Sequence, residues 1–199
     1  MTNLKSHWTD IHENKDKDVS WWQENLWLEF LDFATPGGAA IDVGAGQSPV
    51  GMALASAGYN PVFINDLAAN ALEKSLATAK AENIELIALP GNLLDMDIPK
   101  KVNLWHDRAV FHFLTSEDDF SHYRETVLAN TTEKALLVIA TFSESGPDQC
   151  SGLNVKKYSP SELAVYFAPE FKALKLEKKI HKTPWDSEQE FSIAVMQKH

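Results

Sequence analysis

The sequence predicts one three-layer α/β domain with a mostly parallel seven-stranded sheet that ends in an antiparallel strand pair. Short apolar runs alternate with amphipathic helical patterns between residues 39 and 142, which is typical of a parallel sheet with crossover helices. Two long extended patterns then close the chain. Its 199 residues suffice for one hydrophobic core. We expect residues 1–38 to form an N-terminal arm and helical cap, and residues 39–199 to form the core.

The N-terminal segment is polar and charge-mixed over residues 1–20, so we expect an arm that packs only through Trp8 and Ile11. A helix is predicted from Ser20 onward, because large apolar side chains recur there every three or four residues. Pro36-Gly37-Gly38 ends it. The stripe consists of Trp22, Leu26, Phe30 and Phe33.

The core elements follow from the lengths and periods of the apolar runs. Five strands are predicted at 39–43, 61–65, 84–88, 102–106 and 135–142, with helices at 48–57, 68–82 and 117–130 between them. A last helix begins after Ser159, which can cap it, and should run to about Phe167. The extended patterns 171–181 and 190–197 are joined by the turn-like cluster 183–186, so they must pair antiparallel.

Composition excludes several classes of protein. Acidic residues outnumber Lys and Arg by 28 to 18, and a net charge of −10 repels a nucleic acid backbone. No apolar run reaches the roughly 18–20 residues that span a bilayer, and the first residues lack the layout of a signal peptide. With a single cysteine, Cys150, no internal disulfide forms, so we expect a soluble cytoplasmic protein. The oligomeric state stays open.

A glycine turn follows the first predicted strand. The string AIDVGAGQSP, residues 40–49, places Asp42 at the strand end and then Gly44 and Gly46 in the turn. Glycine is required where the backbone takes positive φ or must approach a ligand closely. In an open, Rossmann-like sheet this turn lies in the crevice that binds ligands, and Asp66, which ends the second strand, can accept bonds from both hydroxyls of a ribose. The pattern predicts a nucleoside-type cofactor.

NAD is one candidate for that cofactor. Its G-x-G-x-x-G motif would need a third glycine at position 49, where this chain has proline. Pro49 fills space and removes an N–H donor that a pyrophosphate would use. A cofactor with a cationic sulfonium and an amino acid end instead favours a carboxylate near the turn, and Asp42 supplies one.

The string IDVGAGQS, residues 41–48, resembles the first motif of class I S-adenosylmethionine-dependent methyltransferases. Three later strings, LWHDRAVFHFL, ATFSESGPDQCSGL and HKTPWDSEQEF, resemble a bacterial branch of that superfamily, with a small methyltransferase domain of unassigned substrate. The likeness covers nearly the whole chain from His7 onward. It departs at Ser48, where the family usually has a third glycine.

This resemblance implies S-adenosylmethionine as the cofactor. Its methionine part would lie against Asp42 and the turn, its ribose on Asp66 and its adenine beside Leu67. Asn92 would accept a bond from the adenine amino group, and Asp107 would face the region of methyl transfer. The implied cofactor-binding residues are Asp42, Gly44, Ala45, Gly46, Asp66, Leu67, Asn92, Leu93 and Asp107.

Methyl transfer is an in-line displacement in which the protein mainly aligns the acceptor, so a base is needed only if the acceptor arrives protonated. The densest group of candidates is His106-Asp107-Arg108, followed by Phe111 and His112, directly after the fourth strand. We expect Asp107, Arg108 and His112 to be the catalytic residues, with Asp107 foremost. In the alternative interpretation, Arg108 pairs with a carboxylate and His112 is a hydrogen-bonded core residue.

Two residues are expected to contact the substrate. Trp21 lies beside the helix stripe and points elsewhere, so its ring is free to cover a ligand. Cys150 lies in the loop 143–152, whose Gly, Ser and Pro content suits a substrate loop. Methyl transfer needs no cysteine nucleophile, and no metal is expected.

The acceptor is predicted to be a small molecule, because only about 38 residues precede the first strand and no domain is inserted. Three alternatives stay open: a protein lysine methyltransferase, a nucleoside-binding module without turnover, and an NAD-dependent oxidoreductase.

Overall fold

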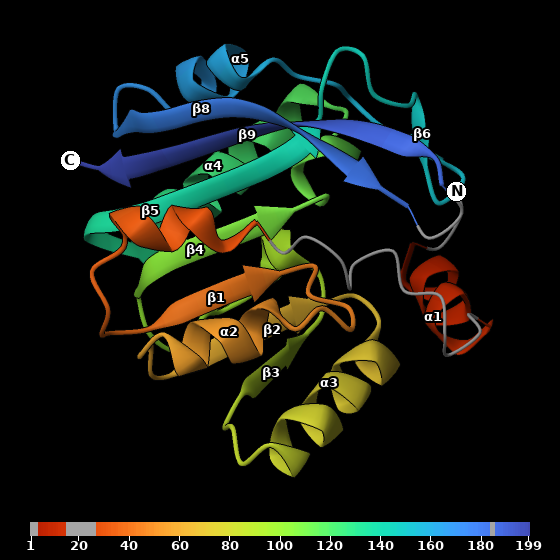
Figure 1. Cartoon of the computed structure of the whole chain (residues 1–199), viewed down its shortest axis with the longest axis vertical. Helices are drawn as coiled ribbons and strands as arrows, with labels where there is room; N and C mark the ends of the chain where they lie inside the picture. The colour runs from red at the N-terminus through yellow and green to blue at the C-terminus, as the bar shows by residue number, and fades with distance from the viewer. Residues whose placement is uncertain (1–3, 15–26, 184–185) are drawn as a thin grey trace.

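A computed structural model describes residues 4–14, 27–183 and 186–199 of the chain, and it confirms the predicted fold class. One seven-stranded sheet runs through the molecule (Figure 1). Five strands are parallel, whereas β9 runs antiparallel to both of its neighbours. In order across the sheet, the strands are β3 (Ile87–Pro90), β2 (Val62–Asp66), β1 (Ala40–Val43), β4 (Val102–Arg108), β5 (Thr131–Phe142), β9 (Glu188–Lys198) and β8 (Phe171–Lys182).

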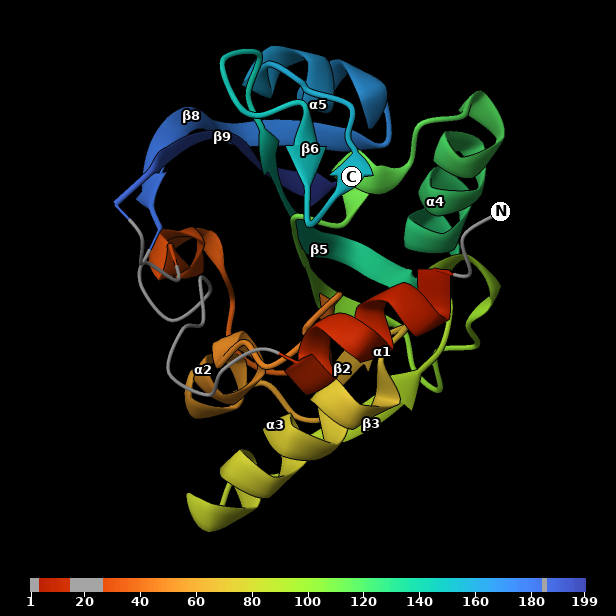
Figure 2. The same ribbon diagram turned by 90° about the vertical axis from the view of Figure 1, so that its right-hand side faces the viewer.

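Helices cover both faces of the sheet and make the three layers (Figures 1 and 2). One face packs against the 3₁₀ helix η1 (Leu28–Phe33), α2 (Val50–Ser56) and α3 (Ala69–Ala81). The opposite face packs against α4 (Glu117–Asn130) and α5 (Pro160–Tyr166). Because both faces are covered, every residue of β1 and β2 is buried, as a parallel sheet requires.

Side-chain caps fix where two of these helices begin. Ser159 accepts a hydrogen bond from the backbone N–H of Glu162, whose carboxylate accepts one from the N–H of Ser159, so the predicted capping box of α5 is present. Ser116 accepts from the N–H of Asp119 and starts α4 at the predicted position.

The N-terminal expectations need correction. Residues of the expected arm form a helix, α1 (Leu4–Asn14), which lies across the carboxyl ends of the parallel strands (Figure 2). Ser20, Trp22 and Leu26 lie outside the described residues. Within the range of the predicted cap helix, the described residues form the 3₁₀ helix η1. They do not continue an α-helix, because Trp27 takes left-handed backbone angles. Phe30 is buried, but Phe33 is 38% exposed.

The largest differences from the predicted core concern two strands and one loop. The strand predicted at 84–88 lies at Ile87–Pro90, and the one predicted to start at 135 starts at Thr131. The loop 143–152 contains half of a small hairpin that was not predicted, formed by β6 (Gln149–Cys150) and β7 (Leu153–Asn154). Two further 3₁₀ turns, η2 (Leu93–Asp95) and η3 (Phe111–Phe113), follow β3 and β4.

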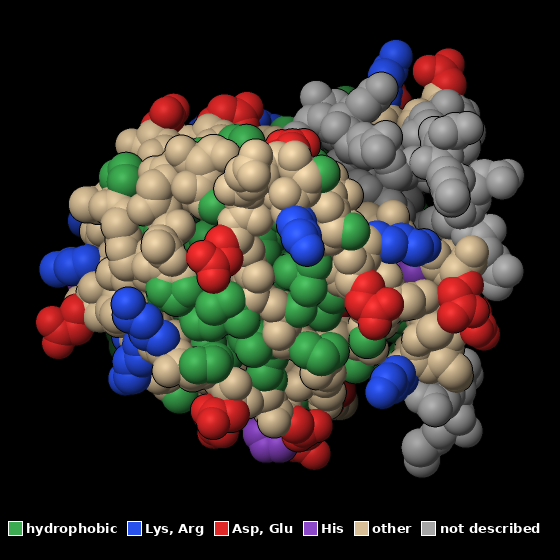
Figure 3. All heavy atoms as spheres, turned by 90° about the horizontal axis from the view of Figure 1, so that it is seen from below, with side chains coloured by type: hydrophobic (Ala, Val, Ile, Leu, Met, Phe, Trp, Pro, Cys, Tyr) green, Lys and Arg blue, Asp and Glu red, His purple; other side chains and the backbone are tan. Residues whose placement is uncertain are grey.

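The surface is mixed in character. Seen from the side of α3 and β3, hydrophobic side chains gather between charged ones (Figure 3). Ile87 on the edge strand β3 is 39% exposed. Within the described ranges, no helix has the length and apolar character needed to cross a membrane.

Candidate active site

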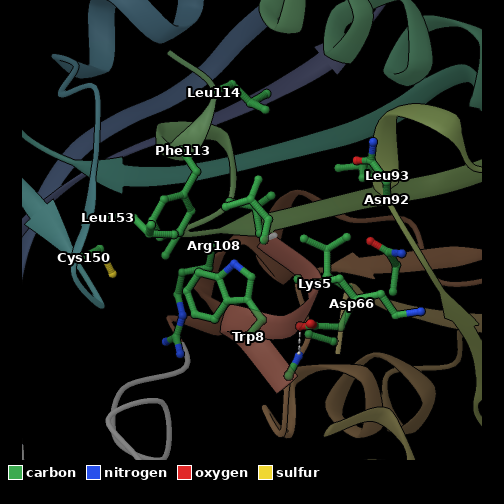
Figure 4. A pocket seen from close by; sticks show the side chains of 18 of the residues that line it. Lys5, Trp8, Asp66, Asn92, Leu93, Arg108, Phe113, Leu114, Cys150 and Leu153 are labelled. Carbon is green, nitrogen blue, oxygen red and sulfur yellow. Dashed lines mark hydrogen bonds between the residues drawn. The ribbon is translucent and has the colours of Figure 1, made fainter. Parts of the chain in front are cut away.

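A cavity of about 640 Å³ lies at the carboxyl ends of β1, β2 and β4. It is closed on one side by α1 and on another by the β6–β7 hairpin. In Figure 4, Asp66, Asn92 and Leu93 lie toward one side of it, and Phe113, Cys150 and Leu153 lie toward the other. A volume of this size is in the range that holds a small-molecule ligand.

The glycine turn forms one wall of the cavity, and its geometry requires glycine. Gly44 and Gly46 have φ of 59° and 51°, which L side chains rarely adopt. A Cβ on Gly44 would lie 2.0 Å from Cγ2 of Val110. Gly46 is held to the next elements by two bonds: its N–H donates to Asp66 at 2.8 Å, and its carbonyl accepts from the hydroxyl of Ser75 at 2.8 Å.

Asp66 ends β2 and is almost fully buried where it lines the cavity. Burial raises the pKa of its carboxyl, and the N–H groups of Ala68 and Gly46 oppose this rise by donating to its two oxygens. A carboxylate offers about four lone-pair sites, so acceptor capacity remains for a ligand.

Asp42 and His106 form a buried pair in the same cavity. They are neighbours in the sheet register of β1 and β4, and Oδ1 of Asp42 lies 2.7 Å from Nδ1 of His106. Each side chain is only 4% exposed. The second carboxylate oxygen, Oδ2 of Asp42, is buried and has no hydrogen-bond partner among the described residues. Such an orphaned acceptor is costly unless a ligand or ion completes it.

The remaining candidates for cofactor binding differ in whether they line the cavity. Ala45, Leu67, Asn92 and Leu93 line the cavity, as do Asp42, Asp66 and both turn glycines. The side chain of Asn92 is engaged locally, where it accepts from the N–H of Leu94 and donates to Asp95. Asp107 is not among the described residues that line the cavity.

Asp107 is fully buried on the opposite face of β4. Its Oδ1 accepts from the N–H groups of Val110 and Phe111, and its Oδ2 accepts from the hydroxyl of Tyr123 at 2.6 Å. Burial raises the pKa of Asp107 to about 6, although these donors and the nearby His106 act against that rise. The carboxylate thus fixes the backbone turn that leads from β4 into η3.

Arg108 and His112 are placed differently from one another. Arg108 lines the cavity, and its guanidinium lies 5.7 Å from the ring centre of Trp27. Burial lowers the pKa of Arg108, and the charge of Asp42 opposes that shift. His112 is fully buried and is not among the lining residues. Its ring accepts a hydrogen bond from the N–H of Phe142, and burial lowers the pKa of His112 to about 3.

Of the two predicted substrate residues, Cys150 lines the cavity and Trp21 lies outside the described residues. The sequence analysis missed the contribution of α1 to the cavity wall, where Trp8 stacks edge-on against Phe113 with ring centres 5.3 Å apart. The signal for it was the helical spacing of Leu4, Trp8, Ile11 and His12, all of which line the cavity.

Contacts from two sides hold α1 over the cavity. On the α3 side, Asn70 donates to the carbonyl of Thr9 and Lys74 to that of His12. On the hairpin side, Nε2 of His7 lies 3.1 Å from the carbonyl oxygen of Ser151. In the part of the chain that the structure describes, no cluster of His, Cys, Asp and Glu has the arrangement of a metal site.

Solved structures share this fold, although no protein-family model and no curated protein matches the sequence. A structure from work on converting a disulfide bond into a thioacetal group during echinomycin biosynthesis has a TM-score of 0.77 and 15% identity, with 98% of this chain and 92% of that chain covered. A Burkholderia thailandensis 1,6-didemethyltoxoflavin-N1-methyltransferase, solved with 1,6-didemethyltoxoflavin and S-adenosylhomocysteine, has a TM-score of 0.76, 15% identity and coverage of 98% and 87%.

A third similar structure is a SAM-dependent methyltransferase from Anabaena variabilis, with a TM-score of 0.72, 15% identity and coverage of 98% and 93%. At such identities the likeness establishes the fold of this chain.

Proposed function

We propose that the chain is an S-adenosylmethionine-dependent methyltransferase that acts on a small-molecule acceptor. The shared fold supports this, because two of the similar structures are methyltransferases. The observation that carries the proposal is the combination of two buried carboxylates, Asp42 and Asp66, with the Gly44–Gly46 turn in one cavity.

The residues fit the cofactor. The unpartnered Oδ2 of Asp42 is a buried anionic acceptor, which suits the positive charge of the methionine part. Asp66 retains acceptor capacity for ribose hydroxyls. Leu67 and Leu93 supply apolar surface for an adenine. The turn needs glycine at both positions, because positive φ strains an L residue there and a Cβ on Gly44 would clash with Val110.

When bound, S-adenosylmethionine supplies an electrophilic methyl group on a sulfonium. The protein's part is to align the acceptor with that group and to exclude water, which can contribute roughly 7–11 kcal/mol. The helix α1 and the hairpin suit this role, because Trp8, Phe113 and Leu153 cover the cavity with apolar surface. This cover also favours a small molecule, since a protein side chain would have to pass it.

Calorimetry with S-adenosylhomocysteine and with NAD tests the proposal. We expect the first to bind and the second not to bind. Replacing Asp66 with alanine should weaken binding of S-adenosylhomocysteine by about 1–3 kcal/mol, because hydrogen bonds to a charged acceptor are lost. Asp97→Ala, at an exposed position, is the matched control and should leave the affinity unchanged.

Because Asp66 also accepts two backbone N–H groups, thermal unfolding of Asp66→Ala must be recorded beside the titration. A folded Asp66→Ala protein that binds as tightly as the wild type contradicts the ribose contact. Absence of S-adenosylhomocysteine binding by the wild type ends the proposal, and NAD binding in its place would favour the oxidoreductase.

A further inference from the structure

We propose that His106 is the general base of the reaction, oriented by Asp42, and that the acceptor is an apolar or aromatic molecule whose attacking group is a protonated O–H or S–H. This inference rests on the proposed function and names the acceptor class of that site.

The first argument is the tautomer of His106. A carboxylate only accepts hydrogen bonds, so the 2.7 Å contact with Asp42 requires the proton of the neutral ring to be on Nδ1. The other ring nitrogen, Nε2, then carries a lone pair. His106 lines the cavity, and Nε2 makes no hydrogen bond to any described residue. A nitrogen in this state can accept a proton from a bound molecule.

The second argument is that the ring is held in place. Phe30 of η1 packs on the imidazole with ring centres 5.3 Å apart, and Asp42 is hydrogen-bonded to Nδ1 of the same ring. The same carboxylate also stabilises the imidazolium that proton transfer produces, as an aspartate does beside a catalytic histidine. Asp42 is thus a positioning residue, and its Oδ2 remains for the cofactor.

The third argument concerns the other charges around His106. Arg108 lines the same cavity from β4, and its positive charge favours an acceptor that becomes anionic. Asp107 lies behind the strand, while Asp66 and His12 line the cavity from β2 and α1. Among the described lining residues, His106 is the one imidazole that a carboxylate orients at the strand ends.

The apolar walls of the cavity indicate the rest of the acceptor. Trp8, Phe113, Leu114 and Leu153 line it, and they come from α1, the segment at η3 and the hairpin (Figure 4). Apolar and aromatic surface of this kind binds a compact apolar molecule or a ring, whose single polar group is then directed toward the strand ends.

The step balances in atoms and charge. As the acceptor oxygen or sulfur forms its bond to the methyl carbon, its proton passes to Nε2 of His106. The carbon–sulfur bond of the sulfonium breaks, and its electron pair stays on sulfur to leave a neutral thioether. The imidazolium then releases the proton to solvent, so the net products are the methylated acceptor, S-adenosylhomocysteine and one proton.

The test uses the full chain, S-adenosylmethionine, and a panel of phenols and aromatic thiols. Some members of the panel are neutral at the assay pH, and others are ionised. His106→Asn is the informative variant, because the asparagine amide can still donate to Asp42 while Nε2 is lost. We expect kcat/KM for neutral phenols to fall about 10²–10⁴-fold, and that for ionised thiols to change less than about threefold. His122→Asn, at an exposed position on α4, should match the wild type.

A positioning role alone would not produce this dependence on the ionisation of the acceptor. Equal losses with neutral and ionised probes overturn the proposal, as does an acid limb of the pH profile that His106→Asn leaves unchanged. Turnover of none of the probes by a wild-type protein that binds S-adenosylhomocysteine shows that the acceptor class is wrong. Absence of S-adenosylhomocysteine binding instead marks failure of the proposed function itself.

Discussion

At the scale of single residues, neighbouring positions on β4 have opposite roles. His106 and Arg108 line the cavity, whereas Asp107 between them faces the other side of the sheet and is sealed there. Tyr123 donates to Asp107 and accepts from Nε1 of Trp105, so the carboxylate belongs to a buried hydrogen-bonded chain. We therefore place Asp107 outside the proposed binding site, as the group that orders the turn before Phe113.

This burial predicts a pH effect for Asp107→Asn. Below pH 6 the folded protein takes up a proton that an unfolded aspartate takes up only near pH 4, so acidification from pH 7 to pH 4 stabilises the wild type relative to the variant. The difference in unfolding free energy between the two proteins should shift by about 2–3 kcal/mol over this range. Urea unfolding at several pH values measures it.

Asparagine suits this experiment because its oxygen can still accept from Val110 and its amide can donate to Tyr123. Asp97→Asn, at an exposed position, serves as the control. A difference between Asp107→Asn and wild type that is independent of pH would contradict the raised pKa.

Part of the site was predictable from residue types and their places on strands. Asp42, the glycine turn and Asp66 end strands that the apolar runs mark clearly, and strand ends meet at one edge of a parallel sheet. Which of His106, Asp107 and Arg108 faces the cavity was not predictable. β4 is covered on both faces, so its side chains show no alternation of apolar and polar character from which to assign the faces.

At the scale of elements, α1 is the part of the site that depends most on contacts beyond its own sequence. Eleven residues form a marginal helix in isolation. The helix α1 is stabilised by packing against the cavity wall, by the hydrogen bonds of Asn70 and Lys74 on α3, and by the stacking of Trp8 on Phe113.

Removing these anchors should loosen the helix without unfolding the domain. In Asn70→Ala/Lys74→Ala we expect the amides of residues 4–14 to exchange hydrogen about 5–150-fold faster, because two hydrogen bonds of about 0.5–1.5 kcal/mol each are lost. Hydrogen exchange read by mass spectrometry measures this. Lys80→Ala, in the last turn of α3, is the control. Unchanged exchange in the double variant would show that α1 is held by packing alone.

Most helices and strands were predictable because the local sequence signals favour the same structure that the fold adopts. Ser159 and its capping box are an example, since every partner lies within three residues. The errors lie where distant residues decide. The arm became a helix only through α3 and the cavity, and β3 is set by pairing with β2 rather than by the apolar run before it. The two-residue strands of the hairpin are too short to show any period.

At the scale of the whole molecule, the described residues that line the cavity come from positions 4 to 154. The described residues after 154, with α5 and the β8–β9 pair, complete the sheet and its core instead. Substitutions there should act on stability, and those around the cavity on affinity.

Ligand binding should therefore stabilise the entire domain. S-adenosylhomocysteine at 100 times its dissociation constant contributes about 2.7 kcal/mol, which corresponds to a rise in Tm of about 5–11 °C for a domain of this size. Thermal scans with and without the ligand measure it, and NAD at equal concentration is the control. A Tm that the ligand leaves unchanged would contradict selective binding to the folded state.

The direction of β9 has a practical consequence. Because this strand runs against β5, it carries the chain back to the amino ends of the parallel strands, and His199 lies at the side of the sheet remote from α1 (Figure 1). A tag or surface linker attached at the C-terminus would therefore leave the mouth of the cavity facing solution. The protein can be immobilised by that end for sensor measurements of its ligands.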